Sequence, residues 1–270
     1  MAKPHTLLQF LKLGGSLITD KTRPHTPKPE VLRRLADEVA NASWRIDGLK
    51  LLIGHGSGSF GHVPARRFNT RQGVSTPDEW RGFVEVWREA AALDRLVIEA
   101  FSTAGLPVIA FPPSASLVAQ DGQVEAWDLS AIERALKAGI IPIVYGDVIF
   151  DSRRGGTIFS TEDLFHHLAQ RLRPGRILLA GLEAGVWADY PRCTEFVDEI
   201  TPETLAQIAP SLGGSAATDV TGGMLSKVEH SLALAQLIPG LEVRIFSGEI
   251  PGMVERALAG EPVGTLIHAT

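Results

Sequence analysis

The composition of the chain excludes several classes of protein. It has 270 residues, 44% of them hydrophobic, which is enough to bury a full core as one large domain or two small ones. Its net charge of -5 and its pI near 5.9 argue against a dedicated nucleic-acid-binding protein, which carries a basic surface. We therefore expect any anionic ligand to be bound by a few cationic side chains at specific positions.

Cysteine content and hydropathy bear on the compartment. Cys193 is the only cysteine, so no intramolecular disulfide can form, and no clustered Cys/His set for zinc is found. The sequence has no run of about 18 apolar residues, and no cleavage-site pattern follows its short apolar N-terminal segment. We expect a cytoplasmic protein with no membrane partner.

Short apolar runs alternate along the chain with longer amphipathic segments. The runs that we expect to be buried strands are 7–13, 49–54, 106–111, 140–150, 176–181 and 241–248. The segments with apolar residues at helical spacing are 28–44, 79–105, 128–139, 161–172, 201–212 and 222–238. This alternation predicts an α/β fold with a mostly parallel sheet covered by helices on both faces.

Unusual sequences follow the predicted strands. They are "GGS" at 14–16, "GHGSGSFGH" at 54–62, "PPSAS" at 112–116, "YGD" at 145–147 and "GLEAG" at 181–185. Ligands of open α/β sheets gather at the carboxyl ends of the strands, so these sequences are the candidate site. Residues 62–80 are the longest polar stretch without a predicted strand, and they fit either a lid over a substrate or an ordinary surface loop.

Two of these strand ends are rich in glycine. In "KLGGS", Lys12 ends the strand and Gly14 and Gly15 follow it, while Lys21 stands nine residues after Lys12. Glycines let backbone amides approach an oxyanion closely, although a Gly-Gly pair after a strand is often a plain turn. Neither stretch matches the P-loop or the dinucleotide-binding motif. Two anions bound between these strand ends would explain why both are rich in glycine. Phosphoryl transfer is a reaction that brings two phosphorylated groups together in this way.

A third glycine-rich stretch is "TDVTGGMLSKV" at 218–228. Gly222 and Gly223 are predicted to open a helix, with Lys227 one turn further along, so free amides and the positive end of the helix dipole would face the loop. This arrangement suits a phosphate. The alternative is a capped helix that carries a solvent-exposed lysine.

Taken together, these motifs resemble the amino acid kinase superfamily and, within it, the isopentenyl phosphate kinases. The resemblance rests on "KLGGSLITDK", "GHGSGSFGH", "PPSA" at 112–115, "YGDV" at 145–148 and "TDVTGGMLSKV", in family order across nearly the whole chain. The histidine that closes "GSFGH" is shared with fosfomycin kinases and is absent from acetylglutamate, aspartate and uridylate kinases. The resemblance implies a three-layer αβα sandwich that uses ATP and Mg2+. It also implies a single domain with an acceptor lobe at about 1–175 and a nucleotide lobe at about 176–270, and a homodimer.

The resemblance also implies roles for individual residues. Lys12 and Lys21 would contact the transferring phosphoryl group, and Asp147 is the candidate to orient the lysines, although an acid in that place can simply cap a turn. The residues expected along ATP are Lys12, Gly14, Gly15, Ser16, Gly58, Leu182, Gly223 and Lys227.

The acceptor side is implied in the same way. Ser57, Gly58 and His62 would hold the phosphate that the substrate already carries, although a histidine here can instead bond only to local backbone. This chain reads "STED" at 160–163 where relatives often read "SGDQ", so Thr161 takes the place of a substrate-contacting glycine. The sequence "GLEAGVW" at 181–187 likewise replaces the "TDVDGVY" of relatives.

One predicted helix is a candidate pocket for a hydrocarbon chain. Phe83, Val86 and Trp87 lie on or near one face of the helix at 79–101, a spacing that is equally typical of ordinary core. The resemblance therefore favours phosphorylation of isopentenyl phosphate, and dimethylallyl phosphate is a second candidate acceptor. Two alternatives remain at this point: a phosphonate kinase of the fosfomycin type, or a nucleotide-binding module without catalysis.

Overall fold

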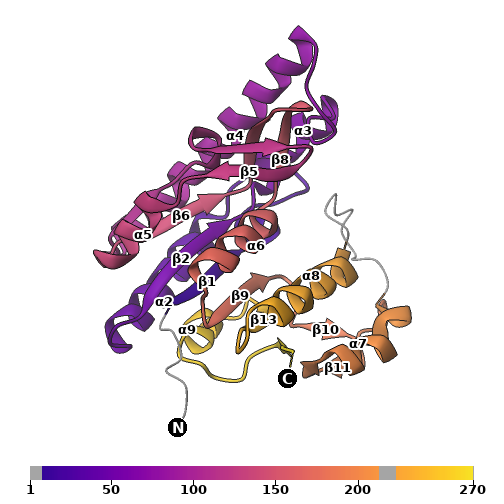
Figure 1. Ribbon diagram of the computed structural model, residues 1–270. Helices are drawn as coiled ribbons and strands as arrows, with labels where there is room; N and C mark the ends of the chain where they lie inside the picture. Colours follow the sequence, from indigo (N-terminus) through magenta and orange to yellow (C-terminus); the bar gives the residue numbers. More distant parts are fainter. Residues whose placement is uncertain (1–7, 213–222, 270) are drawn as a thin grey trace.

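The computed structural model describes residues 8–212 and 223–269, without the side chains of 62–64, 66 and 211 (Figure 1). Eight strands form the main sheet: β1 (Leu8–Leu13), β2 (Lys50–His55), β3 (Val108–Ala110), β6 (Ile141–Tyr145), β9 (Arg176–Gly181), β12 (Glu199–Ile200), β13 (Glu242–Ser247) and β14 (Thr265–Ile267). Their order is β12-β14-β13-β9-β1-β2-β6-β3, and every neighbouring pair is parallel except β13 with β14.

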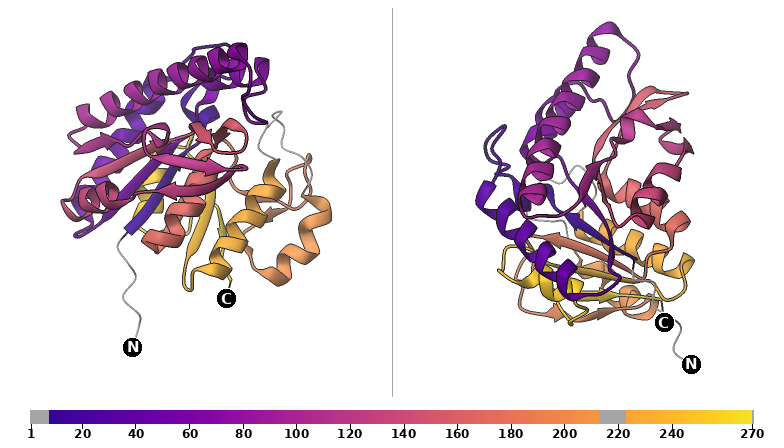
Figure 2. Two further views of the ribbon diagram at one scale, coloured as in Figure 1. Left: turned by 45° about the horizontal axis from the view of Figure 1, so that its top comes forward. Right: turned by 90° about the vertical axis from the view of Figure 1, so that its left-hand side faces the viewer.

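Helices cover both faces of the main sheet. One face packs against α2 (Pro29–Arg45), α4 (Pro77–Thr103) and α9 (Met253–Leu258), and the other against α5 (Ser130–Lys137), α6 (Thr161–Leu172) and α8 (Gly223–Leu237). The right-hand view of Figure 2 separates α2 and α4 from α6 and α8 across the sheet. The predicted three-layer sandwich is therefore confirmed.

Alternate residues of the strands supply the two layers of the core. In β1, Phe10 belongs to the cluster beneath α5, α6 and α8, while Leu11 and Leu13 belong to the cluster beneath α2, α4 and α9. Because side chains alternate across a strand, a strand buried on both sides reads as a continuous apolar run. This is why the central strands can be located in the sequence.

A second, smaller sheet was not predicted. It contains β4 (Leu117–Gln120), β5 (Gln123–Trp127), β7 (Asp147–Asp151) and β8 (Gly155–Phe159) in the order β5-β4-β7-β8. The single strand expected at 140–150 is wrong: Gly146 donates its amide to His55 O at 3.1 Å, and from Asp147 onward the chain pairs with β8 instead of continuing in the main sheet. The small sheet packs on α4 through Val74, Phe83, Val86 and Val148.

The remaining elements are short. They are α1 (Gly15–Ile18), α3 (Gly58–Arg67), α7 (Pro202–Ile208), the strand pair β10 (Val186–Trp187) and β11 (Phe196–Val197), and two 3-10 turns at Pro113–Ala115 and Ala209–Ser211. The polar stretch at 62–80 is mostly helical, since α3 ends at Arg67 and α4 starts at Pro77 behind a Thr76/Glu79 capping box. Within the described ranges, none of the helices combines the length and apolar character needed to cross a membrane.

Candidate active site

The glycine-rich strand ends meet at one edge of the main sheet. Strand β1 lies between β2 and β9, and Lys12 is in register with Gly54 on one side and Leu179 on the other. All three strands are parallel, so the sequences after them emerge on the same edge. The structure therefore brings "GGS", "GHGSG" and "GLEAG" together, as the sequence predicted for a ligand site.

The first two glycine-rich turns touch through their backbones. A Cβ atom on Gly15 would lie 2.5 Å from the amide nitrogen of Gly58 and 2.7 Å from its Cα. Gly58 has φ +52, in the left-handed region that favours glycine, and a Cβ there would lie 2.1 Å from Thr19 Oγ1. These positions require glycine because two main chains approach each other, and the contact places α1 and α3 with their first turns side by side.

Hydroxyl groups lock the two turns together. Thr19 Oγ1 donates to Gly15 O at 2.6 Å and accepts from Ser59 N at 2.9 Å. On the other flank, the amide of Gly14 donates to Ala180 O at 2.8 Å. The predicted ATP residues Gly14 and Gly15 are thus bonded to β9 on one side and, through Thr19, to the helix that begins at Gly58 on the other.

His55, directly before the second glycine-rich turn, links that turn to three neighbouring elements. Its Nε2 lies 3.2 Å from Asp94 Oδ1 on α4, and its ring stacks on Tyr145 at the end of β6 with centroids 5.4 Å apart. Its carbonyl accepts from Thr161 Oγ1 at 2.6 Å. Thr161, predicted to contact substrate, is thus a buried residue at the start of α6 whose hydroxyl donates to the main chain of β2.

Lys12 forms an ion pair with Glu162. Glu162 lies in the first turn of α6, and both side chains are largely buried, with exposed fractions of 13% for Lys12 and 27% for Glu162. A partly buried pair of this kind fixes where the ammonium group sits more firmly than an exposed pair would. Sequence reasoning missed Glu162, because the pairing spans 150 residues and "STED" reads as a helix cap.

Asp147, the predicted partner of the lysines, accepts two hydrogen bonds from backbone amides. Its Oδ2 accepts from Ser114 N at 3.2 Å and its Oδ1 accepts from Val148 N at 2.8 Å. Burial raises the pKa of Asp147 to about 6, against the opposing effect of these hydrogen bonds. Glu162 is thus one carboxylate that pairs with Lys12, and the contacts of Asp147 tie the "PPSA" turn to the start of β7.

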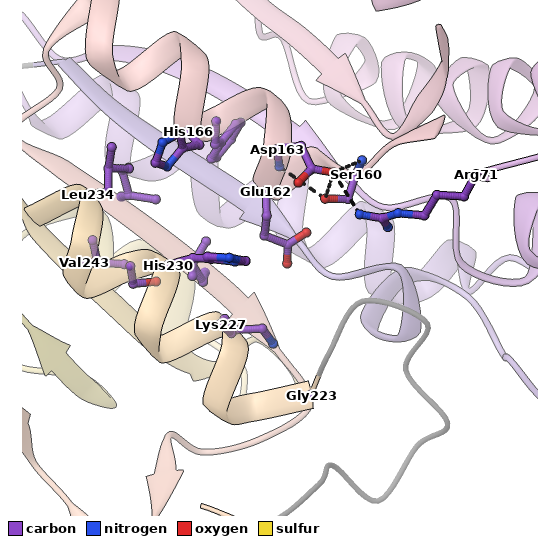
Figure 3. Close-up of a pocket in the computed structure, with 14 residues that line it drawn as sticks. Arg71, Ser160, Glu162, Asp163, His166, Gly223, Lys227, His230, Leu234 and Val243 are labelled. Atoms are coloured by element: carbon purple, nitrogen blue, oxygen red, sulfur yellow. Dashed lines mark hydrogen bonds and ion pairs between the residues drawn. The ribbon is translucent and has the colours of Figure 1, made fainter. Parts of the chain in front are cut away.

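A cavity of about 80 Å³ opens between α6 and α8 (Figure 3). Glu162 reaches into it from α6, and Gly223 and Lys227 line it from the first turns of α8. The structure thus brings the predicted phosphate-binding helix start close to the carboxylate that holds Lys12. Gly222, predicted to open the same helix, lies outside the described residues.

Two histidines and an arginine also line this cavity. His166 on α6 and His230 on α8 are on facing helices, and burial together with the nearby His230 lowers the pKa of His166. Arg71 comes from the polar stretch after α3 and lies 3.4 Å from Asp163 Oδ2. Sequence reasoning did not select these residues, because their proximity depends on how α6, α8 and the 68–76 segment pack.

The other predicted residues lie on several different elements. Lys21 is exposed in the segment between α1 and α2, and Leu182 is 41% exposed directly after β9. His62 is in α3, but its side chain is outside the described set. In the proposed hydrocarbon pocket, Phe83 and Val86 are buried against the small sheet, whereas Trp87 is 42% exposed.

In the described ranges, no group of three or more His, Cys, Asp or Glu side chains could hold a metal ion. The three predicted lysines come from β1, from the segment after α1 and from α8.

Comparisons with known proteins agree with this arrangement. The amino acid kinase family model matches residues 8–247. The isopentenyl phosphate kinase of Methanothermobacter thermautotrophicus is 35% identical, with 96% of this chain and 98% of that protein covered, and that of Haloferax volcanii is 35% identical over 97% and 98%. An X-ray structure of isopentenyl phosphate kinase superposes with a TM-score of 0.80 at 31% identity, covering 96% of this chain and 99% of that one. The chain therefore belongs to the amino acid kinase family, where it groups with the isopentenyl phosphate kinases.

Proposed function

We propose that this protein transfers the γ-phosphoryl group of ATP to the phosphate of isopentenyl phosphate and so forms isopentenyl diphosphate, a step of isoprenoid biosynthesis. The observation that carries the proposal is the backbone contact between Gly15 and Gly58, which sets two amide-rich turns side by side next to the Lys12–Glu162 pair. The near full-length similarity to proteins named isopentenyl phosphate kinase supports the choice of acceptor.

ATP would lie along β1, β9 and the start of α8. Its phosphates would face Gly14, Gly15 and Ser16, with Gly58 at the junction to the acceptor, and Gly223 and Lys227 would approach from the other side. Leu182, exposed after β9, would contact the nucleoside. A magnesium ion would enter the site bound to ATP and would further neutralise the phosphate charge.

The acceptor would lie at the end of β2. Ser57, Gly58 and His62 would hold its phosphate, with Thr161 behind them. In the reaction, an oxygen of this phosphate forms a bond to the γ-phosphorus while the bond from that phosphorus to the β,γ-bridging oxygen breaks, and ADP leaves. The attacking oxygen is already ionised near neutral pH, so no general base and no covalent enzyme intermediate is needed. Lys12 and Lys21 would stabilise the charge on the transferring group.

The hydrocarbon chain would occupy the apolar region between α4 and the small sheet. Phe83 and Val86 lie there against Val74 and Val148, and the Phe83 ring is 5.1 Å from that of Phe150, which is half-exposed. With Trp87 at its margin, this region offers the apolar surface that a five-carbon chain requires, and dimethylallyl phosphate would fit the same chemistry.

The other functions predict different acceptors. A phosphonate kinase of the fosfomycin type needs no apolar region of this kind, and a silent binding module needs no partly buried ion pair at Lys12. The apolar cluster beneath α4 and the Lys12–Glu162 pair therefore favour the prenyl phosphate kinase.

The test measures ADP release with ATP and magnesium for five acceptors offered in parallel: isopentenyl phosphate, dimethylallyl phosphate, fosfomycin, acetylglutamate and UMP. We expect turnover of isopentenyl phosphate above all the others, with dimethylallyl phosphate second. Turnover of fosfomycin, UMP or acetylglutamate without turnover of isopentenyl phosphate would contradict the proposal.

The assembly and the compartment are further parts of the proposal. We expect a homodimer in the cytoplasm, on the basis of the family resemblance and the single cysteine. Light scattering of the purified protein at micromolar concentration tests the first point, and a mass of one chain would contradict it.

A further inference from the structure

The segment that carries Lys21 is closed at its base by main-chain contacts. Thr19 and Pro27 form an antiparallel bridge, and Asp20 N donates to Thr26 O at 2.8 Å. These bonds fix where the segment leaves and rejoins the fold. They do not by themselves determine how its outer part, with Lys21, lies against the rest of the site.

Contacts from residues 25 and 26 attach the outer part to α3. His25 N donates to Ser59 O at 3.3 Å, Thr26 N donates to Ser59 Oγ at 3.1 Å, and the His25 ring meets the edge of Phe60 with centroids 5.5 Å apart. Ser59 and Phe60 are in the first turn of the helix that follows the second glycine-rich turn. The Lys21 segment is therefore attached to the proposed acceptor-phosphate site.

A second attachment reaches α4. His25 Nδ1 lies 2.7 Å from Glu89 Oε2, and the Glu89 side chain is only 12% exposed. A carboxylate in such a place is costly unless it is paired, so the contact with His25 stabilises it in this position. His25 has φ +51, an unusual backbone conformation for a residue with a side chain.

Glu89 also connects this contact to the proposed hydrocarbon pocket. It lies three residues after Val86 on α4, and residues at this spacing are neighbours on a helix surface. Movement of α4 as the apolar region fills would therefore reach His25, and through it the segment with Lys21.

We propose that the His25–Glu89 pair is a positioning contact that holds Lys21 beside the transferring phosphoryl group. The same pair couples the position of Lys21 to the filling of the hydrocarbon pocket. This proposal rests on the proposed function. His25 itself acts through the segment that it holds and does not touch the reacting atoms. Binding energy from the remote hydrocarbon chain would thus appear in kcat, as expected when remote contacts help to align reacting groups.

The kinetic test compares His25→Ala, Glu89→Gln and the double variant with the wild type, with isopentenyl phosphate and methyl phosphate as acceptors. We expect each single change to lower kcat for isopentenyl phosphate about tenfold, to leave the KM for ATP within about twofold, and to be non-additive in the double variant. The kcat advantage of isopentenyl phosphate over methyl phosphate should shrink in all three. His268→Ala is the matched control, because His268 pairs with Glu199 at the far edge of the main sheet, and it should behave as wild type.

A second measurement needs no activity: the rate of trypsin cleavage after Lys21, followed by mass spectrometry in the absence of substrates. We expect cleavage about tenfold faster in His25→Ala and Glu89→Gln than in the wild type or in His268→Ala, because the segment opens more often. Unchanged cleavage, or an unchanged kcat in an active protein, would overturn the positioning role. A wild type that is inactive toward isopentenyl phosphate, with faster cleavage in the variants, would instead contradict the proposed function and leave the attachment supported; the coupling to the hydrocarbon pocket would fall with that function.

Discussion

The two sides of β1 are built in contrasting ways. Toward β2, main-chain atoms of the two glycine-rich turns are in contact, and a Cβ on Gly15 would overlap Gly58. Toward β9, a Cβ on Gly181 would meet nothing within 4 Å, and charged side chains line a cavity between α6 and α8. The β2 side is thus held by the close packing of two glycine turns, whereas the β9 side has room at Gly181 next to a cavity with charged side chains. A methyl group added at Gly15 and one added at Gly181 should therefore have different effects.

The largest expected difference is between Gly15→Ala and Gly181→Ala. The added methyl group on residue 15 must separate two main chains, and a misplacement of about 1 Å at a reacting centre can cost a hundredfold or more, so we expect kcat/KM to fall by about three orders of magnitude. Gly181→Ala has room for the methyl group and should change kcat/KM by less than about threefold. Equal effects of the two changes in folded protein would break the contrast.

Lys21→Ala tests the proposed contact of Lys21 with the transferring phosphoryl group. Its ammonium group should interact more strongly with the transition state than with either ground state, so we expect kcat to fall about a hundredfold while both KM values stay within a few fold. Arg23→Ala is the control, because Arg23 is on the same segment and 71% exposed. An unchanged kcat for folded Lys21→Ala would refute this role.

Glu162→Gln tests the side-chain attachment of Lys12. The neutral amide keeps the shape of the side chain but weakens the attraction that fixes the ammonium group, so we expect kcat to fall about tenfold. The matched control is Glu30→Gln, which breaks an ion pair with Arg33 on the exposed surface of α2 and should leave the kinetics unchanged. A kcat like that of wild type in Glu162→Gln would mean that Lys12 is positioned by other contacts.

Asp147 gives a smaller effect, on stability. Burial raises its pKa to about 6, above the value near 4 of an unfolded chain, so the folded protein binds this proton more tightly and loses stability as the pH rises between those values. The shift corresponds to at most about 3 kcal/mol. Denaturant titrations at pH 4 and pH 7 should show this loss in the wild type and not in Asp147→Asn. The same pH dependence in both proteins would assign the loss to other groups.

The sequence predicts most of the main sheet but little of the small one. β1, β2, β9 and β13 are central strands buried on both faces, so their apolar runs stand out. β4 and β5 are short and partly exposed, and the pairing of β4 with β7 joins segments about 30 residues apart, which no local pattern reveals. The break at Gly146 follows from the same cause, since its amide bonds to a residue in β2.

Some residues of the candidate site could likewise be predicted from the sequence and others could not. Gly15 and Gly58 could be selected from sequence, because the close approach of two main chains requires glycine at these positions. Glu162, Arg71 and His230 could not, since each gains its place from tertiary packing between elements far apart in the chain. Asp147 was selected from sequence as the residue that orients the lysines, and in the structure it accepts hydrogen bonds from Ser114 and Val148.

We infer that the β2 side holds the acceptor's phosphate while the β9 side holds ATP, and substitution of His62 tests this division most directly. Steady-state rates of His62→Ala and His62→Gln would be measured with both substrates varied. A charge-assisted hydrogen bond to the acceptor phosphate is worth roughly 1.5 to 3 kcal/mol, so we expect a fall of about one to two orders of magnitude in kcat/KM for isopentenyl phosphate with the KM for ATP unchanged. Equal losses for both substrates would contradict it.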